Sequence, residues 1–193
     1  MLEDWRHQAV TGALTVDEAR PGHELQFASL VENGTSLARA LFASNSANTE
    51  GWGLYAEFIM QQYLPLEAQL FSQYLRALRA ARMFLDPMVN TGQLTPGQVV
   101  QFLVEQFALS VPLAKSESDR YAFRSPGQAT SYFYGFRSIL GLRTELELAL
   151  GDNFSAREFH DFIVEQGLLQ PGLLREAALL RFLPESVEKH SER

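Results

Sequence analysis

The chain has 193 residues, of which 46% are hydrophobic and 20% are charged, a composition typical of one globular domain with a sizeable core. Its net charge of -7 argues against nucleic acid or an anionic membrane surface as the main partner, because phosphate binding needs a basic face. No cysteine is present, which excludes disulfides, a cysteine nucleophile and thiolate metal ligands. The N-terminus has no signal pattern and no apolar run could span a bilayer, so we expect a soluble, cytoplasmic chain.

Helical patterns fill the first half of the chain. Thr15, followed three residues later by Glu18, has the capping-box pattern that opens a first helix. A second helix is expected over residues 50–64, EGWGLYAEFIMQQYL, where apolar residues recur at helical spacing. A long amphipathic helix follows over residues 66–86, which are rich in Ala, Leu and Arg. Residues 36–49, SLARALFASNSANT, are the most loop-like part of this half.

The second half has clearer helix starts, marked by Pro at the first helical position or by a capping box. The starts are predicted at Thr95 with Pro96, Ser125 with Pro126, Ser155 with Glu158, and near Pro171. Gly167 is the expected stop of the helix that begins after Ser155. Residues 111–127 are the most loop-like part of this half, and the polar tail, residues 184–193, is expected to fray.

The order of these elements indicates the fold class. We find no strand-like alternation of useful length, no tandem repeat and no low-complexity segment. The sequence therefore predicts an all-α, multi-helix fold. Residues 1–193 are expected to form a single helical domain, because the helices on both sides of each loop-like segment have apolar faces that must be buried against one another.

Acids and a histidine lie close together in TVDEARPGHELQ, residues 15–26. A hydrolytic zinc site needs three N or O ligands, an open position for water and a carboxylate that takes the proton of that water. On a straight helix the six-residue gap from Asp17 to His23 would turn the two side chains apart. They converge only if the helix bulges, which Pro21-Gly22 could cause. The alternative is a capped acidic turn, since acids in the first turn of a helix favour its dipole.

These residues also carry a resemblance to a known family. The bacterial domain-of-unknown-function family 885 has His-Glu-x-x-Pro-Gly-His-x-x-Gln, followed by Glu-Gly-Trp-x-x-Tyr-x-Glu. The chain resembles it in order and with plausible spacing over most of its length. The matching segments are DEARPGHELQ, EGWGLYAE, RAARMFLD, RYAFRSPGQATSYFYG and FHDFIVEQGLLQPGLL.

The resemblance implies a helical fold similar to zinc-dependent peptidases of the gluzincin type. It covers only the C-terminal part of the longer family members, so the domain is expected to be a fragment of a larger fold, with metal-site motifs in residues 17–57 and C-terminal helices in residues 95–183. By position, Glu18 would be the general base, and His23 and Glu50 would be metal ligands. Glu57 would orient His23 or the metal-bound water.

Other matching residues are given weaker roles by the resemblance. Tyr132 could donate a hydrogen bond to a developing oxyanion. Arg82, Arg120 and Tyr121 lie in matching segments and could hold a substrate carboxylate, although pairing with neighbouring acids is the better expectation for them. His160 also matches the family, and we expect it to pack between helices rather than bind a metal.

The chain departs from the family pattern at two positions. The first metal histidine is Asp17, and a second histidine, four residues after an Arg-x-x-x-Asp segment, is Asn90. Asp17, with His23 and Glu50, would give two carboxylates and one imidazole. These harder ligands weaken the preference for Zn²⁺ and make Mn²⁺ or another oxygen-tolerant ion more plausible. Loss of two histidines in one cleft can also mean that catalysis has been abandoned.

Two hypotheses for the function follow. The first is a metal-dependent hydrolase, most simply a peptidase, in which Glu18 takes a proton from metal-activated water. The second is a catalytically inactive helical scaffold that binds a peptide or protein partner, because Asp17 replaces the first metal histidine. A half-domain would expose apolar helix faces, so self-association into a homo-oligomer is also expected.

Overall fold

The computed structural model describes residues 2–33 and 36–183, and this part of the chain is all-α, with no strand. The first half contains the helices α1 (Leu2–Glu18), α2 (His23–Glu32), α3 (Leu37–Phe42), α4 (Ser46–Met60) and α5 (Leu66–Asn90). The second half contains α6 (Pro96–Phe107), α7 (Val111–Asp119), α8 (Ser131–Leu150), α9 (Ala156–Glu165) and α10 (Pro171–Phe182). Short 3-10 or π turns connect several of them. The predicted all-α fold class is confirmed.

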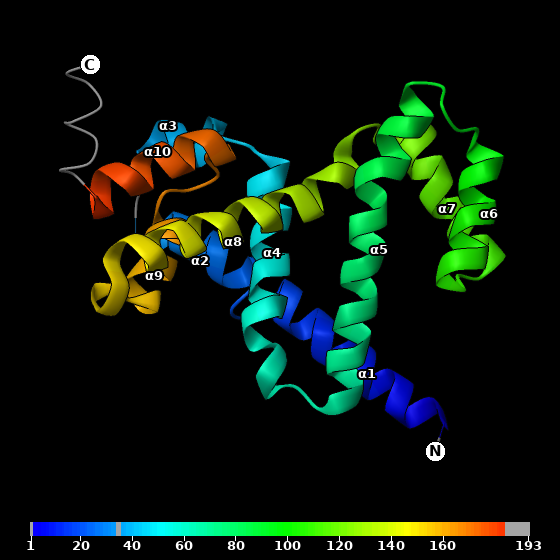
Figure 1. The fold of residues 1–193 in the computed structure, drawn as a ribbon, viewed down its shortest axis with the longest axis horizontal. Helices are drawn as coiled ribbons and strands as arrows, with labels where there is room; N and C mark the ends of the chain where they lie inside the picture. Colours follow the sequence, from blue (N-terminus) through cyan, green and yellow to red (C-terminus); the bar gives the residue numbers. More distant parts are fainter. Residues whose placement is uncertain (1, 34–35, 184–193) are drawn as a thin grey trace.

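Two helices cross near the middle of the molecule, α4 and α8 (Figure 1). Their backbones touch because both carry glycine at the crossing point. A Cβ atom on Gly51 would lie 2.4 Å from the carbonyl carbon of Gly135, and one on Gly135 would lie 1.8 Å from the backbone oxygen of Ala47. No side chain fits at either position, so these two glycines set the distance between the helices.

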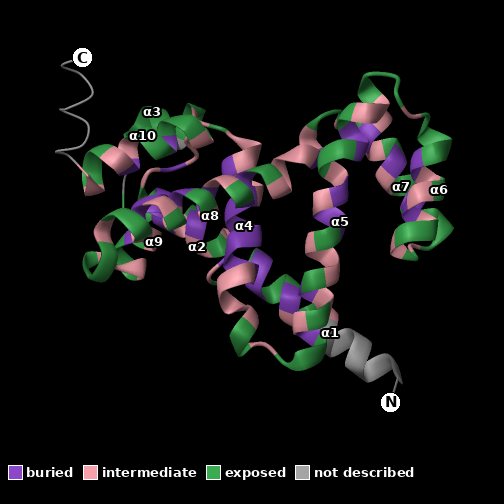
Figure 2. Ribbon diagram, viewed as in Figure 1, coloured by how far each residue is buried: buried purple, intermediate pink, exposed green. Residues whose placement is uncertain are grey.

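The buried residues form two apolar clusters, one on each side of this crossing (Figure 2). The larger cluster joins α4, α8, α9 and α10 and contains buried aromatic residues such as Trp52, Tyr55 and Phe159. The smaller one joins α5, α6 and α7 with the turns that follow α7, and contains Leu85, Leu103 and Tyr121. α1 packs against both α4 and α5. α1, which carries Asp17 and Glu18, therefore contacts one helix from each cluster.

Several helix boundaries confirm the sequence signals. Thr95 caps α6 in a reciprocal capping box with Gln98, and Pro96 is its first residue. The Ser155 hydroxyl accepts from the backbone N–H of Glu158 at the start of α9. Gly167, with φ of 71°, follows the end of α9. The last helix begins at Pro171, as predicted.

Other predictions were wrong. Thr15 lies inside α1 and does not begin a helix, because α1 starts far upstream. The loop-like residues 36–49 contain α3 and the start of α4, and the loop-like residues 111–127 contain α7 and a π turn over Arg120–Arg124. The helix expected at Ser125 begins at Ser131. The tail expected to fray, residues 184–193, lies outside the described residues.

Within the described part of the chain, no helix combines the length and the apolar character that are required to span a bilayer.

Candidate functional site at the junction of α1 and α2

The site begins with a break between two helices. α1 ends at Glu18 and α2 begins at His23, and the N–H of Glu24 reaches back five residues to the carbonyl of Ala19. Gly22 makes the turn possible, because a Cβ atom there would lie 1.8 Å from the backbone oxygen of Asp17. The break expected at Pro21-Gly22 is therefore present, as an interruption between two helices.

Trp52 of α4 holds this turn in place. Its indole N–H lies 2.9 Å from the carbonyl oxygen of Pro21 and 3.1 Å from that of Gly22. The side chain is almost completely buried. The Trp52 indole of the Glu-Gly-Trp segment thus fixes the Pro-Gly turn against α4.

Asp17 and His23 converge over a residue that has no side chain. A Cβ atom on Gly53 of α4 would lie 2.3 Å from Asp17 Oδ1 and 2.9 Å from His23 Nε2. Both polar atoms therefore occupy the space above Gly53 that a side chain would fill. The break brings together the two residues that a straight helix would have separated.

Glu50 approaches the same place from the preceding turn of α4. Its Oε2 lies 3.9 Å from His23 Nε2, while its Oε1 accepts a hydrogen bond of 3.1 Å from Gln128. Burial raises the pKa of Glu50, although the nearby His23 and a hydrogen bond from Tyr132 act to lower it. The structure thus brings Glu50 beside His23, as the sequence predicted.

Asp17 has a partner that sequence analysis missed. The Arg79 guanidinium of α5 donates to Asp17 Oδ2 at 3.2 Å and to Glu57 Oε1 at 2.7 Å. The second oxygen of Glu57 accepts from the Ser72 hydroxyl at 3.0 Å. Arg79, Asp17 and Glu57 are all less than a tenth exposed. They form one buried ion-pair network, and Glu57 braces Arg79 rather than contacting His23.

The two carboxyl groups of this network share one cation. Burial raises the pKa of Asp17 and of Glu57, and in each case Arg79 acts in the opposite direction as the nearest positive charge. Asp17 also lies in the last turn of α1, where a negative charge is unfavourable to the helix dipole. The expectation that the acids occupy a favourable first turn was wrong. The positive charge of Arg79 compensates the negative charge of Asp17.

Tyr132 is surrounded by arginines. The guanidinium carbons of Arg82 and Arg120 lie 5.2 and 5.3 Å from the centre of its ring, and that of Arg79 lies 5.9 Å away. Its hydroxyl accepts from Arg120 at 3.1 Å. Cations over an aromatic face are stabilising. Tyr132 is therefore fixed beside Glu50, where the sequence predicted a site residue.

Arg82, Arg120 and Tyr121 meet at one acid, Glu117 of α7. Arg82 donates to Glu117 Oε2 at 2.8 Å, the Tyr121 hydroxyl donates to the same atom at 2.7 Å, and Arg120 Nη1 lies 3.7 Å from Oε1. Burial and the Glu117 charge raise the pKa of Tyr121 above its ordinary range. The expectation that these arginines pair with a neighbouring acid is confirmed.

Asn90 does not lie beside Asp17. Its side chain donates to Asp86 Oδ1 at 2.7 Å and to the carbonyl of Tyr121 at 3.2 Å. It is also eleven residues along α5 from Arg79, or about 16 Å at the helical rise. The two departures from the family pattern are therefore not in one cleft, and Asn90 has a structural role.

Asp86, which sequence analysis did not single out, fixes the loop that delivers Gln128 to Glu50. It is fully buried, and its carboxylate accepts from the backbone N–H groups of Gly127 at 2.8 Å and Ala129 at 2.9 Å. The neighbouring Gln128 also accepts from Arg120. A signal for Asp86 was present in the sequence, because Ser72, Arg79 and Asp86 repeat every seven residues along α5. This spacing places three polar residues on one side of an amphipathic helix.

Among the residues whose side chains are described (10–33, 36–39 and 41–183), no three His, Cys, Asp or Glu side chains are gathered closely enough to hold a metal ion. Asp17 and Glu50 each approach His23, but one oxygen of Asp17 is held by Arg79. Glu18 is exposed at the end of α1. As they are placed, the donors do not fit a complete metal centre.

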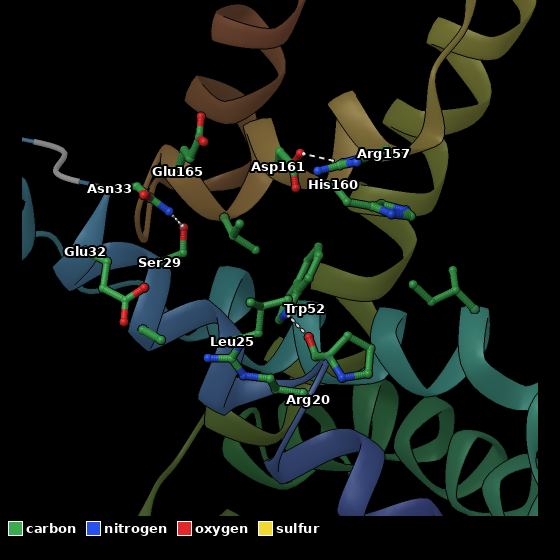
Figure 3. Close-up of a pocket in the computed structure, with 14 residues that line it drawn as sticks. Arg20, Leu25, Ser29, Glu32, Asn33, Trp52, Arg157, His160, Asp161 and Glu165 are labelled. Atoms are coloured by element: carbon green, nitrogen blue, oxygen red, sulfur yellow. Dashed lines mark hydrogen bonds and ion pairs between the residues drawn. The ribbon is translucent and has the colours of Figure 1, made fainter.

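A cavity lies on the other side of the Pro-Gly turn, between α2 and α9 (Figure 3). It has a volume of about 400 Å³, with Leu25 and Val164 among its apolar lining and Glu32 and Glu165 among its acids. His160 also lines it; its Nε2 lies 2.8 Å from the Tyr55 hydroxyl, and burial lowers its pKa. The packing role expected for His160 agrees with this position.

The fold and the site together define an all-α protein in which a broken helix, a glycine-bearing helix and a buried arginine gather acids around one histidine. The chain belongs to the family described as bacterial protein of unknown function (DUF885), which matches residues 3–177.

Two solved structures resemble the chain closely. One, from Colwellia psychrerythraea and described as a putative lipoprotein, has 30% sequence identity and a TM-score of 0.81 over 88% of this chain and 30% of its own. The other, from Shewanella oneidensis and described as a putative lipoprotein of unknown function, has 25% identity and a TM-score of 0.76 over 86% of this chain and 31% of its own. The chain thus spans about a third of the length of these proteins. No curated protein matches it.

Proposed function

We propose that this chain is a helical domain that binds a peptide or protein partner and does not by itself catalyse metal-dependent hydrolysis. The observation that carries the proposal is the Arg79 guanidinium, which bridges Asp17 and Glu57 in the interior. A metal ligand at Asp17 would have to compete with that arginine. Breaking a buried ion pair leaves an unpaired charge, at a cost of about 3–5 kcal/mol.

The substitution of aspartate for histidine explains why the arginine matters. Histidine is neutral when it binds a metal, whereas an ionised aspartate adds a negative charge next to Glu57 and Glu50. Arg79 supplies the positive charge that such a cluster needs. The Arg79 guanidinium therefore stabilises the site as an internal cation. In the family pattern, by contrast, the residues at this place would bind a metal ion.

Binding of a partner is supported by two further features. The cavity between α2 and α9 has an apolar lining and a polar rim, and its volume of about 400 Å³ is within the ordinary range for ligand sites. Large apolar side chains at the end of α2 and on α3 are exposed to solvent, namely Val31, Leu37, Leu41 and Phe42. Exposed apolar groups concentrated in one segment are typical of surfaces that contact another polypeptide.

A metal-dependent hydrolase is the second candidate, favoured by the convergence of Asp17 Oδ1 and His23 Nε2 over Gly53 with Glu50 alongside. In that case Asp17, His23 and Glu50 would hold Zn²⁺ or Mn²⁺, Glu18 would be the general base and Tyr132 would stabilise the oxyanion. Asp17 would have to exchange Arg79 for the metal.

Metal content separates the two candidates. We expect the purified chain, loaded with Zn²⁺ or Mn²⁺ and then dialysed, to retain only background metal by mass spectrometry. Stability should be the same with and without a chelator. Retention of one equivalent that disappears in Glu50→Ala would instead support the hydrolase.

A further inference from the structure

The cavity between α2 and α9 has a rigid apolar wall. Trp52 and Val164 line it and are buried members of the larger apolar cluster. Leu25 and Ile59 also line it and pack against the same cluster. Because the interior of a protein is close-packed, these side chains cannot move inward to fill the volume of about 400 Å³. The wall therefore favours an occupant with an apolar body.

The rim of the cavity is acidic once its own ion pairs are taken into account. The charged residues that line it are Arg20, Glu32, Arg157, Asp161 and Glu165. Arg20 donates to both carboxylate oxygens of Glu24. Arg157 lies 3.6 Å from Asp161. The remaining two acids, one on each helix, have no cation within ion-pairing distance in the part of the chain that the structure describes.

These two glutamates lie at the ends of their helices. Glu32 is the last residue of α2, and Glu165 is the last residue of α9. Figure 3 shows both on the same side of the cavity, with Asn33 between them in this view. The C-terminus of a helix carries a partial negative charge, so an acid there is unfavourable to the helix dipole. The two helix ends and the two carboxylates therefore concentrate negative charge at one end of the cavity, which we name the acidic end.

A buried hydroxyl adds further acceptors at the acidic end. Ser29 lines the cavity and is only 4% exposed. Its oxygen accepts a hydrogen bond of 3.3 Å from the side-chain nitrogen of Asn33. The carbonyl oxygen of the Asn33 amide remains an acceptor, and the Ser29 oxygen has a second lone pair. The acidic end is therefore rich in acceptors, which favours a group that only donates.

We propose that the cavity binds the side chain of a lysine that belongs to the peptide or protein partner. A lysine side chain combines an apolar stem with a charged head. The stem packs against the apolar wall, and the ammonium group donates to Glu32 and Glu165 at the acidic end. An ammonium group is a compact charge with three donors, which suits acceptors from two helices better than the planar fork of arginine does. The inference rests on the proposed function and names the chemical group by which the partner is recognised.

An apolar surface next to the acidic end favours a polypeptide over a free alkylamine. Val31, which precedes Glu32, is 81% exposed, and Leu37 of α3 is 75% exposed. α3 lies beside the end of α9, because Arg39 Nη1 lies 3.5 Å from Gln166 Oε1. A polypeptide with apolar residues near its lysine would cover this surface while the lysine fills the cavity. A free alkylamine would leave it exposed to solvent.

Titrations with three probes test the proposal. They are the pentapeptide acetyl-Leu-Ala-Lys-Ala-Leu-amide, the same peptide with norleucine in place of lysine, and n-butylamine. The indole N–H signal of Trp52, which lines the cavity, reports binding in ¹H–¹⁵N spectra. The chain has two tryptophans, and the Trp5→Phe variant identifies this signal. We expect the lysine peptide to bind at least about fivefold more tightly than the norleucine peptide, which lacks the ammonium group. This difference should shrink when the salt is raised from about 0.05 to 0.5 M.

Substitutions at the acidic end test the residues that recognise the ammonium group. Glu32→Gln and Glu165→Gln change exposed side chains, so the fold should be retained and the melting temperature should not fall. Each should weaken binding of the lysine peptide by about two- to fivefold and leave binding of the norleucine peptide unchanged. The matched control is Glu158→Gln, which removes an exposed charge from the first turn of α9, outside the cavity, and should change neither.

The outcomes separate this inference from the proposed function. Equal binding of the lysine and norleucine peptides, or no shift of the Trp52 signal with either, would overturn the lysine assignment. Binding of n-butylamine as tight as that of the lysine peptide would overturn the choice of a polypeptide. A failure of the proposed function itself would be seen separately, as one retained equivalent of metal in the wild-type chain.

Discussion

Removal of the Arg79 charge is the perturbation that bears most directly on the buried network. Arg79→Met keeps much of the aliphatic stem but leaves Asp17 and Glu57, which are 6% and 1% exposed, without their shared cation. Loss of one partner from a buried ion pair costs about 3–5 kcal/mol. For a chain of this size, that corresponds to a fall in melting temperature of roughly 6–20 °C.

The effect should depend on pH in a defined direction. Burial already raises the pKa of Asp17 and Glu57, and Arg79 acts against that rise. Without Arg79 both pKa values rise further. An acid with a raised folded-state pKa binds its proton more tightly in the folded state, so stability falls as pH increases from its unfolded to its folded pKa. The variant should therefore be least stable at neutral pH and approach the wild type as the pH is lowered.

Urea unfolding followed by circular dichroism at pH 5 and pH 7.5 measures both effects. The matched control is the double variant Asp17→Asn with Arg79→Met, which removes one buried negative charge together with the cation. Its stability at pH 7.5 should exceed that of Arg79→Met alone. A destabilisation below about 1 kcal/mol that is the same at both pH values would place the pair in the range of an exposed salt bridge and would contradict a buried network around Arg79.

Two further predictions concern the scaffold. Gly135→Ala should strongly destabilise the fold, by roughly 3 kcal/mol or more in thermal melts, since its Cβ would lie 1.8 Å from a backbone oxygen of α4. The matched control is Gly141→Ala on the same helix. Its Cβ would meet no atom within 4 Å, so the fold should become more stable by about 0.5–1 kcal/mol. Similar losses of stability in Gly135→Ala and Gly141→Ala would contradict the close crossing of α4 and α8. Asp86→Ala should abolish the hydrogen-exchange protection of the Gly127 and Ala129 amides at a cost of about 2–3 kcal/mol, because both donate to its carboxylate. Unchanged protection would exclude that role.

The elements that the sequence predicted well are those with local signals. The cap at Thr95, the prolines at 96 and 171 and the cap at Ser155 each act within one helical turn. Thr15 carries the same local pattern, but it lies inside a helix that began upstream, so its hydroxyl has no free helix end to cap. A capping pattern therefore identifies a helix start only when the preceding residues are not themselves helical.

The site was predictable only in part, for a different physical reason. The Pro-Gly break indicated that Asp17 and His23 could converge, and the structure brings them together over Gly53. The partner of Asp17 is Arg79, sixty-two residues away, and helical spacing does not reveal which two helices will pack. The repeat of polar residues every seven positions along α5, which includes Arg79, gave a partial signal. It indicated that Arg79 has an acidic partner, because a buried arginine on an apolar face requires an acid.

The Asp17→His variant tests what the aspartate contributes to the site. It introduces the histidine that the resemblance implies at this position, and it removes the carboxylate that Arg79 binds. Arg79 would retain Glu57 as a partner. The variant then offers two imidazoles and the Glu50 carboxylate, a donor set of the kind that binds Zn²⁺ in catalytic sites.

Zinc titration of the wild-type chain and of Asp17→His, followed by calorimetry, measures whether Arg79 keeps a metal ion from binding to Asp17. We expect no stoichiometric binding by the wild type and about one equivalent by the variant, as three protein ligands allow. Stoichiometric binding by the wild type, with loss of that binding in Glu50→Ala, would show that Asp17 serves as a ligand despite Arg79 and would contradict the proposed function.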